Sequence, residues 1–281
     1  MSFFLKRGVD VSGFLKREDT FFADSFEAQK NITAERKTLF RQETIAERRT
    51  RLSSEMFENL KGRVAHGLFK GLHLDPVPGW GNMDLCSMLL GTYEMEIMEV
   101  LQRSRFLHRK HLVNIGAADG YYSIGGIYSG RFQTVDCFEL TDIGRQTIAR
   151  NAQRNGVDDK VHIFGEATNN FPDQLEDVKW EQTIVLCDIE GAEFELLDEA
   201  CLDRLSKATI LIEIHNWVPG FRFKYRKFLE QAAQRFNIEL LESSGLPRQF
   251  LPELRGYTDD NRMLMLSEGR PNIMRYLLLT N

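Results

Sequence analysis

The pattern of apolar and polar positions along the chain changes near residue 110. Beyond it, short apolar runs cover residues 111–115, 134–140, 161–164, 183–187 and 208–214. Helix-like segments separate them, over residues 123–130, 142–155, 170–178 and 192–206. Because the runs are continuous rather than alternating, they predict strands buried on both faces of a parallel sheet. Strands separated by helices predict an α/β domain built from right-handed βαβ units.

The C-terminal part departs from this alternation. Residues 221–236 predict a helix, and residues 238–242 and 274–280 predict strands. The segment between these two strands has no clear helical pattern, so we expect it to be irregular. The two strands are therefore expected to form an antiparallel pair at the edge of the sheet.

The first 109 residues predict a helical N-terminal extension to a main domain formed by residues 110–281. Residues 34–70 are rich in helix formers and contain no proline. Two amphipathic faces stand out, formed by Leu52, Met56, Leu60 and Val64 and by Leu90, Tyr93, Ile97 and Leu101. We expect the first helix to pack on the main domain; a homodimer through these helices is the alternative.

Composition restricts the class of protein. The chain has 281 residues, of which 42% are hydrophobic and 27% charged, with a formal net charge of -5, as in an ordinary globular protein. A mildly acidic protein is not attracted to phosphate backbones, so nucleic acid is not an expected partner. The chain has no apolar run of the roughly 20 residues that cross a bilayer, and it begins without a signal-peptide core. We expect a cytoplasmic location.

The four cysteines have no metal-binding or disulfide pattern. Cys86, Cys137, Cys187 and Cys201 are far apart in the sequence, and no C-x-x-C spacing occurs among them. Two of them lie within predicted strands. They are therefore expected to be buried free thiols.

A loop of small residues follows the first predicted strand, with the sequence NIGAADG at positions 114–120. Gly116, Ala118 and Gly120 allow a sharp turn and a close approach to a ligand. The helix expected next would offer free N–H groups and the positive end of its dipole. Ligands of doubly wound sheets bind at the carboxyl ends of the strands, which makes this loop a candidate cofactor site.

Two further strand ends border the same region. Glu139 ends the second predicted strand about 20 residues after the loop, where an acidic side chain can accept hydrogen bonds from ribose hydroxyls. Glu166 and Ala167 follow the third strand and are candidates for contacts with an adenine ring. Together with the loop, these residues predict a site for an adenosine-containing cofactor.

The fourth strand ends in the motif CDIEGAE at positions 187–193. Together with NIGAADGYYS at 114–123, Phe138-Glu139, the helix end at Asn151 to Gly156, and Ile212 to Ile214, this motif resembles the FkbM family of class I methyltransferases. The resemblance covers about residues 90–216. It implies a Rossmann-like fold with a seven-stranded, mostly parallel sheet and an antiparallel last strand. It also implies S-adenosyl-L-methionine as the cofactor and methylation of a hydroxyl on a sugar or natural product.

Carried over by position, the resemblance assigns the cofactor site to Gly116, Ala118, Gly120, Glu139 and Asp188. Glu139 would hold the ribose, and Asp188 would close the methionine side. Tyr121 and Ser123, from the same motif, are counted with this site.

The cofactor loop departs from the family pattern at two positions. The family normally has aspartate where Asn114 stands and often asparagine where Ala118 stands. The first change removes a charge near the methionine amino group, and the second removes a polar contact.

An alcohol acceptor must lose its proton during attack, so a general base is expected. The fourth and fifth strands should be neighbours, which brings Asp188 and Glu190 towards His215. His215 is the preferred base, with the two carboxylates beside it. In the alternative, Asp188, Glu190, His215 and Asn216 hold a divalent metal ion such as Mg²⁺, which we do not favour.

The remaining candidates concern the substrate. Tyr121, Tyr93 and Trp217 offer aromatic faces for the sulfonium or for packing. Tyr93-Glu94 precedes the first strand by a length that would let it fold over the cofactor. Arg262 and Arg270 lie in the expected irregular stretch and could bond acceptor hydroxyls.

Two other functions compete with methyl transfer. An NAD-dependent oxidoreductase would need the glycine pattern of dinucleotide folds, but residue 118 is alanine and residue 121 is tyrosine. A non-catalytic, methyltransferase-like binding module would use the helical N-terminal part to bind a partner.

Overall fold

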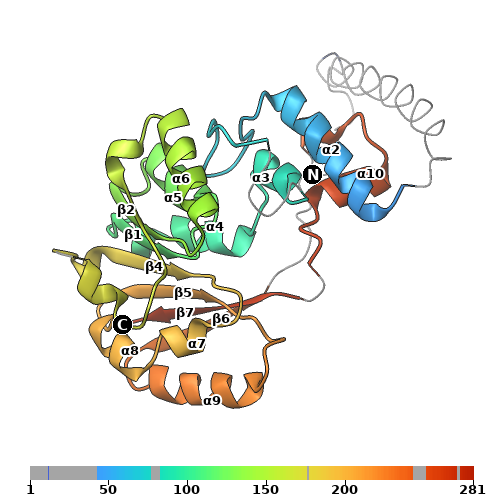
Figure 1. The fold of residues 1–281 in the computed structure, drawn as a ribbon. Coiled ribbons are helices and arrows are strands. Elements are labelled where there is room, and N and C mark those ends of the chain that lie inside the picture. The colour runs from blue at the N-terminus through green and yellow to red at the C-terminus, as the bar shows by residue number, and fades with distance from the viewer. Residues whose placement is uncertain (1–11, 13–42, 77–82, 176, 243–250, 271–272) are drawn as a thin grey trace.

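The computed structural model describes residues 12, 43–76, 83–175, 177–242, 251–270 and 273–281. Seven strands within these ranges form one sheet in the order β3-β2-β1-β4-β5-β7-β6 (Figure 1). Their bounds are β1 His111–Ile115, β2 Thr134–Phe138, β3 Val161–Phe164, β4 Thr183–Cys187, β5 Thr209–Glu213, β6 Asn237–Glu242 and β7 Arg275–Thr280. Strands β1 to β5 pair in parallel, whereas β7 is antiparallel to β5 and β6. The predicted Rossmann-like sheet with an antiparallel last strand is confirmed.

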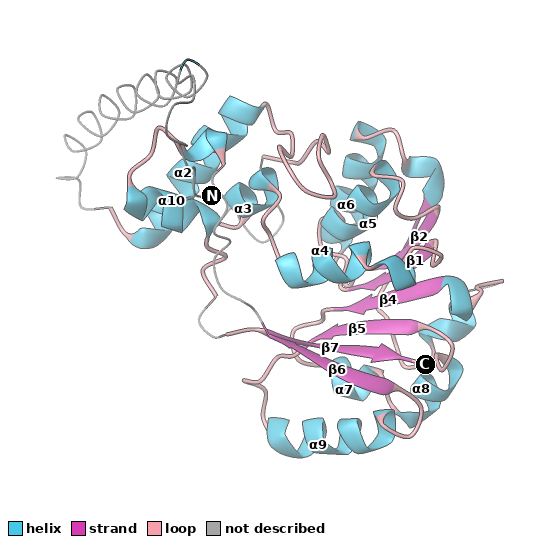
Figure 2. Ribbon diagram, turned by 180° about the vertical axis from the view of Figure 1, so that it is seen from behind, coloured by secondary structure: helices cyan, strands magenta, loops and turns pink. Residues whose placement is uncertain are grey.

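The central strands are buried along their whole length. All five residues of β4 and all five of β5 are buried, because helices cover both faces of the sheet (Figures 1 and 2). One core contains Leu112, Val135 and Ile148, and the other contains Val113 and Phe228. Adjacent residues of one strand thus enter opposite cores, which explains the continuous apolar runs.

Different helices cover the two faces. Helices α4 (Met95–Gln102), α5 (Tyr121–Tyr128) and α6 (Asp142–Arg154) contribute to the first core, and α7 (Glu193–Leu196), α8 (Glu199–Arg204) and α9 (Phe221–Ala232) to the second. Short 3₁₀ turns lie at Ser104–Phe106, Asp158–Lys160, Phe171–Gln174, Trp180–Gln182 and Pro252–Leu254.

The N-terminal helices pack against a segment from the other end of the chain. Helix α2 (Ile45–Leu60) begins with a capping box formed by Thr44 and Glu47. Helices α2 and α3 (Leu85–Leu90) both contact α10 (Asp259–Leu266) (Figure 1). The chain therefore returns to the N-terminal helices before it enters β7.

Several expected helices differ from the structure. The predicted helix through Leu90 and Leu101 is two helices, because Gly91 and Glu94 adopt left-handed conformations with φ of 72° and 43°. Val64 lies beyond α2, which ends where Lys61 turns left-handed. The predicted helix over 170–178 is only a 3₁₀ turn.

The C-terminal half holds two more corrections. Residues 192–206 form two helices, because the side chain of Asp198 caps a new start at α8. The stretch expected to be irregular contains α10, capped by the side chain of Thr258. The antiparallel pair of β6 and β7 is confirmed, but only β6 lies at the sheet edge, because β7 inserts beside β5.

Other expectations concern the chain as a whole. All four cysteines are free and buried, as predicted. Among the described residues, no helix has the length and apolar character needed to cross a membrane. The predicted division at residues 109 and 110 and the homodimer stay predictions. The part of the N-terminal extension before residue 43, apart from residue 12, lies outside the described residues.

Candidate functional site

A cavity of about 840 Å³ lies at the carboxyl ends of the parallel strands. It is bordered by the loops that follow β1, β2, β3, β4 and β5. Asp84, Met88, Tyr93 and Ile97 close it from the N-terminal helices, and residues 268–270 close it from the segment after α10. The volume is at the upper end of the range of small-molecule sites.

The loop after β1 lies directly against the loop after β4. Gly116 has φ of 81°, and a Cβ atom there would lie 1.7 Å from the backbone oxygen of Asp188. Only glycine fits such an approach. Ala118 also has positive φ, at 54°, which is strained for a residue with a side chain.

Side chains behind the loop hold it in place. Nδ2 of Asn114 donates to Oγ of Ser123 at 2.9 Å. Nδ2 of Asn151, on α6, donates to the backbone oxygen of Asp119 at 3.0 Å. The Asp119 carboxylate accepts from the backbone N–H of Tyr121 at 3.0 Å, and burial raises the pKa of Asp119 to about 7.

Glu139 is fixed with its carboxylate at the cavity wall. Its Oε2 accepts from the backbone N–H of Ala118 at 3.0 Å, and its Oε1 accepts from the backbone N–H and hydroxyl of Thr141 at 2.9 and 2.7 Å. Gly144 makes room for it, because a Cβ there would lie 2.6 Å from Cγ of Glu139. The side chain is thus held in place by groups of the protein itself.

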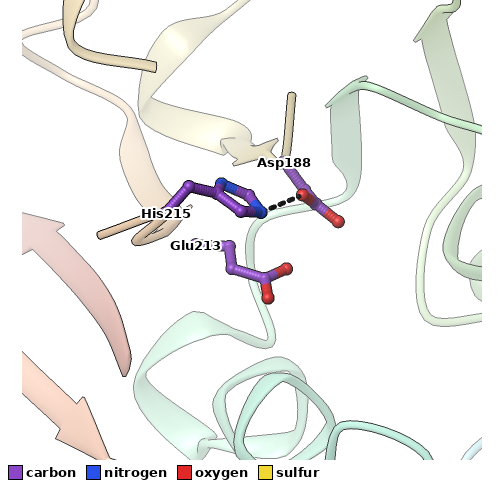
Figure 3. Close-up of side chains that lie close together, drawn as sticks. All are labelled: Asp188, Glu213 and His215. Atoms are coloured by element: carbon purple, nitrogen blue, oxygen red, sulfur yellow. Dashed lines mark ion pairs between the residues drawn. The ribbon is translucent and has the colours of Figure 1, made fainter. Parts of the chain in front are cut away.

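Three ionisable side chains converge where β4 and β5 end. Asp188, Glu213 and His215 each place a candidate ligand atom within 4.8 Å of the others (Figure 3). Nε2 of His215 lies 3.5 Å from Oδ1 of Asp188 and 3.6 Å from Oε2 of the exposed Glu190. Nδ1 of His215 is in contact with Oε1 of Glu193 on the other side.

The surroundings of Asp188, Glu213 and His215 raise the pKa of each side chain and so favour its protonated form. Burial raises the pKa of Asp188 to about 6, and burial together with the nearby Asp188 charge raises the pKa of Glu213 to about 10. For His215, burial lowers the pKa, but the hydrogen bond that it donates to Glu193 and the charges of Glu193, Asp188 and Glu190 outweigh burial and raise the pKa. Groups of this kind can accept or release a proton.

Arg270 supplies positive charge at the edge of the trio. Its guanidinium forms ion pairs with Glu213 and with Glu94, and its Nε lies 2.7 Å from Oε2 of Glu268. Glu94, which is 1% exposed, also accepts a hydrogen bond from the hydroxyl of Tyr122. Arg270 therefore connects the segment after α10 with the end of β5 and with the turn before α4.

Most of the predicted site residues line this cavity, namely Tyr93, Asn114, Gly116, Ala118, Tyr121, Glu139, Glu166, Ala167, Asp188, Glu190, His215, Trp217 and Arg270. Five others do not. Gly120 caps α5, Ser123 is buried behind the loop, Glu94 is paired as above, and Asn216 is exposed. Arg262 lies on α10, where it pairs with Asp259 and donates to the backbone oxygen of Tyr257 at 2.6 Å.

Some cavity residues were not predicted. Asp84, Met88 and Tyr122 line it, although no motif marks the first two. Tyr122 is adjacent to Tyr121 in the loop motif, which was the available signal. The metal alternative also changes, because the structure groups Glu213 with Asp188 and His215, in place of the expected Glu190 and Asn216.

Comparison with known proteins gives no family. No protein-family model matches the chain, and no curated protein matches it. Solved structures that resemble it include an O-methyltransferase from Bacillus cereus in complex with SAH, which is 14% identical over 82% of this chain and 91% of that one, with a TM-score of 0.44. Precorrin-6y C5,15-methyltransferase from Geobacter metallireducens is 15% identical over 66% and 88%, with a TM-score of 0.44.

An uncharacterised protein from Listeria monocytogenes serotype 4b is also similar, at 10% identity over 66% of each chain and a TM-score of 0.39. The match therefore spans about two thirds of the length of that protein. At these values the likeness carries no argument about chemistry. The fold assignment stands on the strand order of the sheet.

Proposed function

We propose that this chain is an S-adenosylmethionine-dependent methyltransferase of the FkbM kind, which methylates a hydroxyl on a sugar or natural product. The observation that carries the proposal is one cavity bordered by two features. One is the small-residue loop with Glu139, and the other is the trio of Asp188, Glu213 and His215, of which Glu213 and His215 are buried.

The residues on the loop side fit the cofactor. The loops after β1 and β4 pack together at Gly116 and both line the cavity, and Glu139 lines it beside them. A carboxylate oxygen carries two acceptor positions, so Oε2 of Glu139 can accept from one ribose hydroxyl while Glu139 keeps its contacts with Ala118 and Thr141. Glu166 and Ala167 border the same cavity and would lie beside the adenine.

Asp188, Glu213 and His215 would act on the hydroxyl that accepts the methyl group. When bound, the cofactor supplies a methyl group on a sulfonium sulfur, which keeps the bonding electron pair as the methyl leaves. The acceptor oxygen forms the new bond and loses its proton, which Nε2 of His215 accepts. His215 is buried, which lowers the local dielectric and strengthens its electrostatic interactions during this proton transfer.

The charge around the trio favours a base over a metal site. Arg270 already pairs with Glu213, so a positive charge lies next to the carboxylates without an added ion. Dialysis against EDTA should then leave turnover unchanged. Loss of turnover that Mg²⁺ restores would instead assign Asp188, Glu213 and His215 to a metal ion.

Calorimetric titration separates the three candidate functions. We expect S-adenosylmethionine and S-adenosylhomocysteine to bind and NAD not to bind. Glu139→Ala should weaken both S-adenosyl ligands by about tenfold, since hydrogen bonds to a charged group contribute about 1.5–3 kcal/mol. Glu181→Ala, an exposed carboxylate outside the cavity, is the matched control. Binding of NAD alone would support the oxidoreductase, and binding of none of the three would support the non-catalytic module.

A further inference from the structure

His215 is held between a carboxylate inside the protein and the cavity. Glu193 is fully buried and His215 is 2% exposed. Nδ1 of the imidazole contacts Oε1 of Glu193, whereas Nε2 faces the cavity near Asp188 and Glu190. The distances from Nε2 to those two carboxylates, 3.5 and 3.6 Å, are longer than an ordinary N–H···O hydrogen bond. The two ring nitrogens of His215 therefore have different surroundings: Nδ1 contacts a buried carboxylate, and Nε2 faces the cavity.

Glu193 is anchored independently of the histidine. Its Oε1 also accepts from the backbone N–H of Gly191 at 2.9 Å and of Ile189 at 3.4 Å. Gly191 has φ of 109°, and a Cβ there would lie 2.1 Å from Cγ1 of Val218. The loops after β4 and β5 are thus packed together, which fixes the carboxylate relative to the imidazole.

We propose that Glu193 is a positioning residue, which places the single proton of neutral His215 on Nδ1 and leaves the lone pair of Nε2 facing the cavity. An ionised carboxylate only accepts hydrogen bonds, and neutral imidazole has one N–H. The contact with Glu193 therefore requires the N–H at Nδ1. The same logic underlies the buried aspartate that orients the histidine of a serine protease.

This assignment rests on the proposed function for the use made of Nε2. In methyl transfer to a hydroxyl, Nε2 takes the proton from the acceptor oxygen and His215 becomes an imidazolium. Glu193 stabilises that cation through the hydrogen bond at Nδ1, while the acceptor oxygen keeps the electron pair that forms its bond to the methyl carbon. Glu193 itself touches neither the acceptor nor the cofactor cavity.

Glu193→Gln tests the role with little change of shape. The amide oxygen can take the place of Oε1 and still accept from the N–H groups of Gly191, Ile189 and His215. The amide nitrogen can take the place of Oε2, which is buried without a hydrogen-bond partner among the described residues. The variant removes the negative charge, so the titration midpoint of His215 should move to lower pH. The acidic limb of the rate against pH should move in the same direction.

Nitrogen-15 NMR of the imidazoles reads the tautomer directly. The full chain has six histidines, and His215→Gln identifies the signal of interest. We expect the unmodified protein to show protonated Nδ1 and unprotonated Nε2 at high pH. Glu193→Ala should lose this preference and lower kcat by about 100-fold with KM nearly unchanged, the size expected for a misplaced general base.

Glu199→Gln is the matched control, since its exposed carboxylate lies on the next helix, α8, pairs with Arg235 and does not line the cavity. It should leave the midpoint and the tautomer of His215 unchanged. A proton on Nε2 in the unmodified protein, or an equal midpoint in Glu193→Gln, would overturn the assignment. If the tautomer and the shift are as expected but no S-adenosyl ligand binds, the positioning role stands and the proposed function fails.

Discussion

The backbone at Gly116 is packed against the backbone oxygen of Asp188, so that a Cβ atom on Gly116 would lie 1.7 Å from that oxygen. Asp188 N–H also donates to the backbone oxygen of Ile115 at 3.0 Å. The two loops that border the candidate cofactor site are therefore one unit. A change at Gly116 must move the residues that surround the acceptor trio.

Gly116→Ala should weaken S-adenosylhomocysteine at least tenfold and lower the free energy of unfolding by about 1–3 kcal/mol, because the methyl group forces the loops apart and strains a left-handed backbone. Gly156→Ala is the control, since Gly156 also has positive φ but nothing lies within 4 Å of its added Cβ. Calorimetry and urea unfolding measure both effects. Equal ligand affinity in the two variants would contradict a tight contact between the loops.

Asn114→Asp should bind S-adenosylmethionine as well as the unmodified chain or better. Asn114 is 2% exposed and donates to Oγ of Ser123, and an aspartate there would accept from the same hydroxyl. The added charge would lie near the methionine amino group. Calorimetric titration checks this, and a marked loss of affinity would show that the amide is required.

His215→Ala should abolish turnover, with a loss of about 100-fold or more, and keep the affinity for S-adenosylhomocysteine. In the proposed function, the imidazole takes the acceptor proton and does not hold the cofactor. His215→Gln is the control for collapse of the site, because glutamine fills more of the space left by the imidazole than alanine does. Near-normal turnover in both variants, with binding intact, would rule out His215 as the base.

Arg270→Gln should lower the free energy of unfolding by about 3–5 kcal/mol, because the buried Glu94 would lose its ionic partner. Arg226→Gln breaks a pair with Glu230 in which both side chains are exposed. That control should change stability by less than about 1 kcal/mol. Urea unfolding distinguishes the two, and equal effects would mean that the Arg270 pairs contribute little.

Asp119 should make stability depend on pH. Its pKa is raised from 3.8 to about 7 in the folded protein, so its contribution is complete below about pH 4 and is lost as pH rises through about 7. Asp119→Asn keeps the acceptor for the Tyr121 N–H and does not titrate. The variant should therefore lose about 4 kcal/mol less stability than the unmodified chain between pH 4 and 8.

The matched control for that experiment is Asp142→Asn, because the Asp142 side chain is 83% exposed. Its stability should follow the unmodified chain across the same pH range. Parallel curves for all three proteins would show that the pKa of Asp119 is the same in the folded and the unfolded protein, which would contradict the prediction.

The sequence alone determined the sheet and the position of the site along it. Continuous apolar runs followed by Gly116, Glu139 and Asp188 predict buried parallel strands whose polar ends meet at one edge, because both faces of each strand must be covered. It also placed His215 near Asp188, since consecutive buried strands are usually neighbours.

Tertiary structure alone decided the partners of these residues. That Arg270 reaches Glu213 and Glu94, and that Glu193 faces Nδ1 of His215, depends on contacts between segments far apart in the chain. The same holds for α10, whose short amphipathic segment becomes a helix against α2 and α3. Local propensity does not encode such contacts, because their stability comes from burial and charge pairing in the folded state.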